Sequence, residues 1–156
     1  MANFSDTFTG SDGTLLTAHT SDSGHTWTIG VGSNNAAITS NRIRNSGPGG
    51  SGQSIFAYNS CLTADGNYDV TTPMRCVTAL AYAGVGIKYI TASGNRYWWW
   101  WNGTGFEILK NVTGVQTSLA TSSPYSLTAG TDYTIVCEVR ESGSTVTMTL
   151  KVSVTT

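Results

Sequence analysis

Two segments near the end of the chain alternate apolar and polar residues, and this pattern constrains the fold most. Every second residue is apolar in 131–140 and again in 145–154. The apolar positions are Tyr133, Ile135, Cys137 and Val139 in the first segment and Val146, Met148, Leu150, Val152 and Val154 in the second. Successive side chains of a strand point to opposite faces. With a turn at 141–144, the pattern predicts an antiparallel hairpin with one core face and one threonine-rich face in solvent.

The rest of the chain favours the same class of fold. No stretch longer than a turn has helical apolar spacing, and turn residues recur about every ten residues, which is typical of an all-β sandwich or barrel. Further strands are expected at 76–83, 84–91, 106–112 and 116–120, with Gly84 and Gly86 allowing a bend or bulge. Loops are expected at 10–13, 21–24 and 45–53. No linker divides the chain, so we expect a single domain over residues 1–156.

The charge content excludes several classes of function. Charged residues make up 11% of the chain and the net charge is −1, against roughly 25% charged residues in ordinary soluble proteins. Because the basic residues are scattered, binding to nucleic acid by phosphate neutralisation is not expected. No apolar run approaches membrane-spanning length. Three cysteines without a Cys-x-x-Cys spacing predict neither a disulfide framework nor a zinc site.

A run of five aromatic residues, 97–101, supplies the candidate binding site. It lies between turn signals at 92–95 and 102–105 and reads as one strand, which cannot bury all its indoles on one face. Two-residue loops on both sides give conflicting registers, whereas a three-residue loop at 102–104 removes the conflict. That register predicts Trp98 and Trp100 in the core, opposite Ile108 and Phe106. The predicted outward site then consists of Tyr97, Trp99 and Trp101 with Lys88 and Glu107 beside Trp99.

An outward row of aromatic side chains has three interpretations. It can anchor another protein subunit or stack on sugar rings, or the chain's own loop at 45–53 can cover it. An apolar patch of this size is unusual on a monomer.

Catalytic and metal sites are not indicated. A glycosidase needs two carboxylates flanking the scissile bond, and Glu107 has no carboxylate partner in the predicted register. We therefore expect no enzymatic activity. His19, Asp22 and His25 could in principle hold a metal, but side chains that cap turns are the favoured interpretation. No metal and no cofactor are expected.

Several motifs resemble those of a known family. They lie at 4–15, 19–27, 94–97, 101–104, 127–133 and 138–146. Together they resemble the concanavalin A-like (laminin G-like) jelly rolls of tailed phages and bacterial surface proteins. The resemblance implies an all-β antiparallel sandwich with jelly-roll connectivity. Members that bind calcium use an early and a late Asp; Asp6 matches the first, and the second is missing.

The resemblance also carries the expectation about function. It implies a non-enzymatic phage virion protein, either a capsid decoration (cement) protein or a fibre or tail component. Such a protein would contact other virion proteins and copies of itself as a homo-oligomer. The first residues lack a secretory signal, so we expect synthesis in the host cytoplasm and a final place in the virion. Members commonly add a strand beyond the last hairpin, which is here either absent or supplied by a neighbouring subunit. The alternative function is a carbohydrate-binding module that recognises glycans through the aromatic row.

Overall fold

The computed structural model describes residues 5–31, 36–45, 56–59, 66–75, 83–90 and 95–155. The chain divides into two compact units, 1–64 and 65–156, and each is described by itself. The expectation of a single domain stays a prediction. Within the described ranges, no helix has the length and apolar character needed to cross a bilayer.

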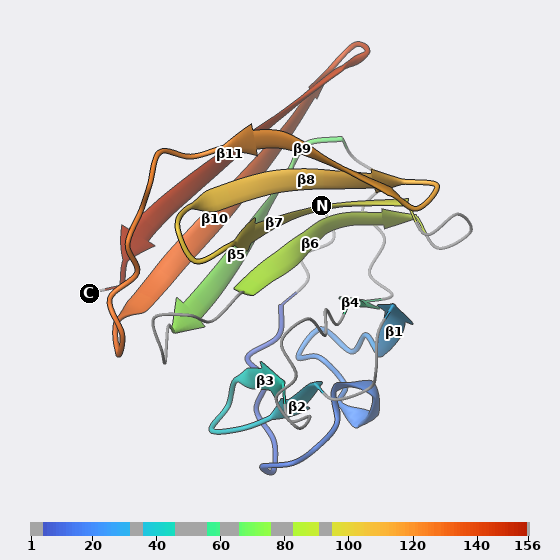
Figure 1. Cartoon of the computed structure of the whole chain (residues 1–156). Coiled ribbons are helices and arrows are strands. Elements are labelled where there is room, and N and C mark those ends of the chain that lie inside the picture. Colours follow the sequence, from blue (N-terminus) through green and yellow to red (C-terminus); the bar gives the residue numbers. More distant parts are fainter. Residues whose placement is uncertain are drawn as a thin grey trace. The chain divides into compact units, whose positions relative to one another are not determined.

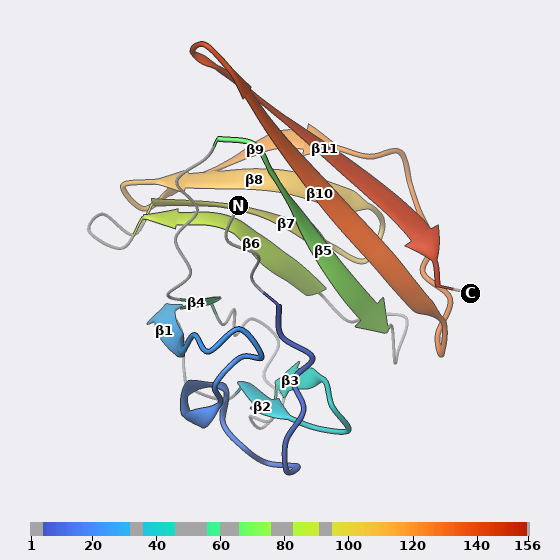
Figure 2. The same ribbon diagram turned by 180° about the vertical axis from the view of Figure 1, so that it is seen from behind.

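The second unit contains two antiparallel sheets, of three and four strands, consistent with a sandwich (Figures 1 and 2). The three-stranded sheet has the order β11-β10-β5, with β5 at Tyr68–Arg75, β10 at Asp132–Ser142 and β11 at Thr145–Val154. The four-stranded sheet follows the chain as β6-β7-β8-β9, at Ala83–Ile90, Asn95–Trp101, Phe106–Val112 and Val115–Thr121. The all-β prediction is confirmed.

The hairpin of β10 and β11 confirms the period-two interpretation. Its strands pair from Tyr133 and Val154 to Ser142 and Thr145. The turn between them contains Gly143, whose φ of 60° favours glycine. Alternate residues of β10 are buried, and they join residues of the four-stranded sheet in one hydrophobic cluster. The core therefore lies between the two sheets, on the face that the alternation predicted.

The hairpin of β8 and β9 is also confirmed. It was expected from strands at 106–112 and 116–120, and Val112 pairs with Val115 across a two-residue turn. Thr113 and Gly114 both have positive φ, 51° and 87°. A type I′ turn, which is common in two-residue hairpin loops, requires positive φ at both of its central residues. The expected strand at 84–91 corresponds to β6, whereas 76–82 of the expected strand 76–83 lies outside the described residues.

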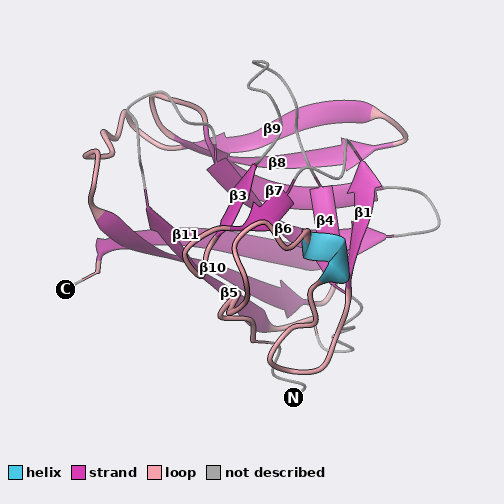
Figure 3. Ribbon diagram, turned by 90° about the horizontal axis from the view of Figure 1, so that it is seen from below, coloured by secondary structure: helices cyan, strands magenta, loops and turns pink. Residues whose placement is uncertain are grey.

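The first unit holds shorter elements. The 3₁₀ helix η1 spans Leu16–Ala18 and is cyan in Figure 3. Strand β1 (Trp27–Val31) pairs with β4 (Phe56–Asn59), and β2 (Ala36–Ile38) pairs with β3 (Ile43–Asn45). Leu16 and the whole of β2 are buried and provide the apolar interior of this unit. The expected loops at 10–13 and 21–24 consist of turns and bends. Most of the expected loop at 45–53 lies outside the described residues.

Candidate functional site

The aromatic row that was expected to point outward faces the interior. Trp99 is 0% exposed and Trp101 is 2% exposed, and both belong to the hydrophobic cluster between the sheets. Tyr97 is partly buried and packs against the same cluster. The Trp99 ring meets Phe106 in a T-shaped arrangement with 6.0 Å between the ring centroids. The predicted orientation of this row is therefore wrong, and the row is part of the core.

The error is a one-residue slip with two causes. The turn between β7 and β8 has four residues rather than three, because Trp101 pairs with Phe106. The pairing of β6 with β7 shifts register between Gly86 and Lys88, which leaves Ile87 as the extra residue of a β-bulge. Because side chains alternate along a strand, a slip of one residue exchanges the two faces of the strand.

Lys88 and Glu107 do not flank Trp99. Lys88 pairs with Tyr97, and Glu107 pairs with Trp100 on the face of the sheet that points away from the cluster. The Trp100 indole N–H donates to Glu107 Oε2 over 2.7 Å. Hydrogen bonds from Ser118 first, and then from Trp100, lower the pKa of the Glu107 carboxyl. Glu107 is therefore an ionised acceptor already engaged by neighbours of its own sheet.

Trp98 is buried as predicted, but on the other face of the sheet. It is 4% exposed and lies opposite Leu109, which is 1% exposed. The Arg96 guanidinium lies over the Trp98 ring, 5.5 Å from its centroid, in a cation–π contact. Trp100 on the same face is only half-buried.

An open edge of the second unit is the candidate site that sequence reasoning missed. All seven residues of β9 are exposed, including Val115 at 65%. A cleft of about 510 Å³ lies between β8 and β9 on one side and β11 on the other. Its lining is mainly apolar and includes Phe106 and Ile108 of β8, Tyr125, and Met148, Leu150 and Val152 of β11.

The charge on this edge is low. β9 contains no charged residue, and Lys151 is the single charged residue of β11. Lys151 Nζ lies 2.6 Å from Glu138 Oε1 on the neighbouring strand. An exposed strand edge that carries little charge and is partly apolar is suited to pairing with another polypeptide.

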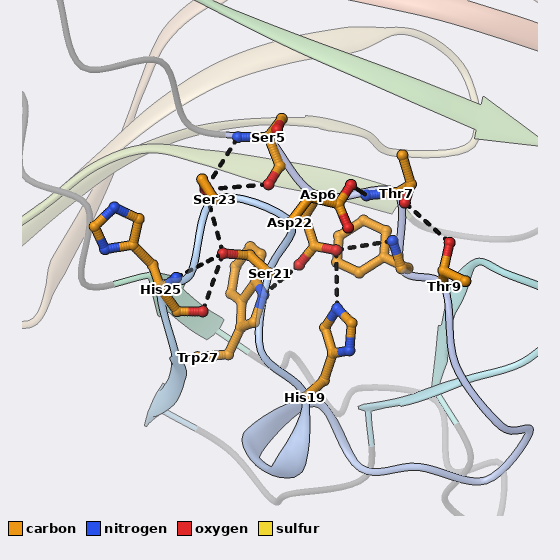
Figure 4. Close-up of polar contacts among 11 residues, drawn as sticks. Ser5, Asp6, Thr7, Thr9, His19, Ser21, Asp22, Ser23, His25 and Trp27 are labelled. Atoms are coloured by element: carbon orange, nitrogen blue, oxygen red, sulfur yellow. Dashed lines mark hydrogen bonds and ion pairs between the residues drawn. The ribbon is translucent and has the colours of Figure 1, made fainter.

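A cluster of polar side chains surrounds Asp6 in the first unit (Figure 4). The Asp6 side chain is 1% exposed, and three N–H groups lie within hydrogen-bonding distance of its carboxylate. His19 Nε2 lies 2.9 Å from Oδ1, the Phe8 amide donates to Oδ1 over 2.8 Å, and the Trp27 indole donates to Oδ2 over 2.7 Å. Donors around both oxygens fit a buried structural carboxylate, and they leave it poorly placed as a cation ligand.

The residues considered for a metal site hold turns together instead. Asp22 Oδ2 accepts the Thr7 amide over 2.9 Å, whereas His19 contacts Asp6. The Ser21 hydroxyl accepts a hydrogen bond from the backbone amide of His25 over 3.0 Å. Among the described residues, no group of three or more His, Cys, Asp or Glu side chains is placed to hold a metal ion.

Comparison with known proteins assigns the chain to no family. A scan against protein-family models matches none, and searches of curated proteins and of solved structures find no significant match.

Proposed function

We propose that the chain is a non-enzymatic structural protein of a bacteriophage virion, with jelly-roll connectivity. Its role would be that of a capsid decoration (cement) protein or of a fibre or tail component. The proposal rests on one observation, the open edge formed by β9 and β11 with its apolar cleft. Proteins that act as monomers usually block such an edge with charges, prolines or a covering segment.

The composition of the chain and its sequence resemblance agree with this proposal. A low content of charged residues, 11%, suits surfaces that become buried in an assembly, because interface cores are depleted of charge. The sequence motifs resemble those of phage jelly rolls. Assembly through strand edges needs no catalytic group, and the proposal assigns none.

The alternative of glycan recognition loses its main support. It depended on Tyr97, Trp99 and Trp101 forming an outward row, and Trp99 and Trp101 are buried in the core. The proposal therefore assigns the open edge to protein partners.

Particle analysis tests the proposed function directly. Particles released after prophage induction, or from an infected culture, are purified on a density gradient, and their proteins are identified by mass spectrometry. The chain is expected to sediment with the particles at a fixed ratio to the major capsid protein. Absence from washed particles, with the chain abundant in the lysate, would contradict a virion role.

A further inference from the structure

The outer edge of β11 presents a regular row of unpaired backbone groups. The Thr155 amide donates to the Asp132 carbonyl over 2.9 Å, next to the pair of Tyr133 with Val154. In an antiparallel ladder, residues alternate between those that bond to the neighbouring strand and those that face away from it. The residues facing away from β10 are therefore Val146, Met148, Leu150, Val152 and Val154. Among the described residues, no backbone hydrogen bond joins this row to another segment.

The apolar side chains on β11 belong to the same five residues and are arranged symmetrically. Leu150 is the central one, and Val146 and Val154 lie four residues to either side of it. These two valines are 52% and 55% exposed, whereas Met148, Leu150 and Val152 pack against the core. The strand is therefore self-complementary about Leu150 in both its backbone groups and its side chains.

Devices that prevent edge pairing are missing from β11. The strand has ten residues, contains no proline and pairs with β10 in an uninterrupted register. Its single charge, on Lys151, is matched by Glu138. β9, which lines the same cleft, has a register shift in its pairing with β8, between the partners of Ile108 and Leu109. A bulge of this kind hinders edge pairing, so β11 is the better docking edge.

We propose that β11 pairs antiparallel with β11 of a second copy of this chain, about a two-fold axis at Leu150. The inference rests on the proposed function, because it names the partner at the same open edge. Each three-stranded sheet then continues into the other. Val146 lies opposite Val154 of the partner subunit, and Lys151 lies opposite Thr149 of the partner subunit, so no like charges face each other directly.

The symmetry selects this register. A centre midway between two residues would set outward groups against groups already bonded to β10, and a centre one residue away would leave Val146 or Val154 opposite no residue of β11. A centre two residues away would leave Val146 or Val154 without a valine opposite it. Only the centre at Leu150 pairs all five outward residues of β11 with the same five residues of the second copy.

Light scattering and sedimentation equilibrium of the full chain test the dimer and its register. The wild type is expected to be a dimer at micromolar concentration. V146K/V154K places lysine opposite lysine at two symmetric positions and should weaken the dimer by about tenfold or more, because like charges opposite each other destabilise a strand pair. V146K/V154E places lysine opposite glutamate at the same positions and should restore the dimer. Leu15→Lys, at an exposed leucine of the first unit outside the open edge, is the control and should leave the dimer unchanged.

Each outcome decides one point. A monomeric wild type overturns the inference and leaves the particle test of the virion role unaffected. A V146K/V154K dimer as tight as the wild type overturns the β11 interface, and a V146K/V154E variant no tighter than V146K/V154K overturns the register. Circular dichroism of each variant excludes unfolding as the cause of a lost dimer. A β11 dimer that is absent from virions would refute the proposed function and keep the inferred contact.

Discussion

Replacing Trp99 by phenylalanine tests how the core accommodates its central indole. Trp99 is fully buried, and among the described residues its N–H has no hydrogen-bond acceptor. Trp101 lies two residues away on the same strand and is 2% exposed. Its indole N–H donates to the Tyr125 carbonyl over 3.4 Å. The two tryptophans therefore share a core and differ in whether the N–H has a partner.

The expected difference follows from this contrast. Trp99→Phe and Trp101→Phe remove the same atoms from one core, so their costs in lost burial cancel to first order. A buried donor without a partner costs about 1–3 kcal/mol, and a hydrogen bond contributes about 0.5–1.5 kcal/mol, with a long bond near the lower end. Trp99→Phe removes the cost, whereas Trp101→Phe removes the bond. Trp99→Phe should therefore be more stable than Trp101→Phe by about 2 kcal/mol.

Urea unfolding followed by far-ultraviolet circular dichroism measures this difference. The two variants should have equal denaturant dependence and different midpoints, so that the midpoints report the free energy of unfolding. Equal midpoints, or a lower midpoint for Trp99→Phe, would refute the argument that the unpartnered indole N–H destabilises the core.

Three further changes have expected outcomes. Gly84→Ala should destabilise the chain by several kcal/mol, because the new Cβ would meet the backbone of β7. At Gly86 a new Cβ has open space around it, so Gly86→Ala should stay within about 1 kcal/mol of the wild type. Thermal unfolding compares the stability of the two variants. Asp6→Asn should place the amide N–H of the new side chain against a donor such as the Trp27 indole and lower the free energy of unfolding by about 1–3 kcal/mol. The loss should be measurable as faster hydrogen exchange of the backbone amides in residues 5–9. Burial first, and then nearby carboxylates, raises the pKa of Cys137 from 9.0 to about 11. Because the folded-state pKa is the higher one, stability should be intact below pH 9 and fall as the pH rises to about 11. In a pH series of urea midpoints, C137A should reduce this dependence, and Tyr68, whose pKa burial also raises, should keep part of it above pH 10.

Hairpins with a clean period of two could be predicted from the sequence. In β10, the buried residues Tyr133, Ile135, Cys137 and Val139 alternate with polar or less buried ones, and a glycine turn follows. The alternation fixes the face of the strand without any knowledge of its register. Phe106 and Ile108 of β8, expected in the core from the predicted register, also lie in the cluster.

The faces of β7 could not be read in this way. Its residues from Tyr97 to Trp101 are all aromatic, so the strand has no alternation of its own and its orientation depends on its neighbours' register. That register changes at the Ile87 bulge and again with the length of the turn at 102–105. Each is a change of one residue, and one residue is enough to exchange the core with the opposite face.

One signal in the sequence did bear on the orientation of β7. In β6, Gly84 and Gly86 alternate with Ala83, Val85 and Ile87, so the glycines share the face away from the core. Gly86 pairs with Trp98 and Gly84 pairs with Trp100. A strand glycine has no side chain, which leaves room on its face for a large aromatic residue of the neighbouring strand. The glycines thus place Trp98 and Trp100 away from the core, and Trp99 and Trp101 must then fill it. The exposed apolar surface of this unit is instead the edge of β9 and β11, which the indoles do not form.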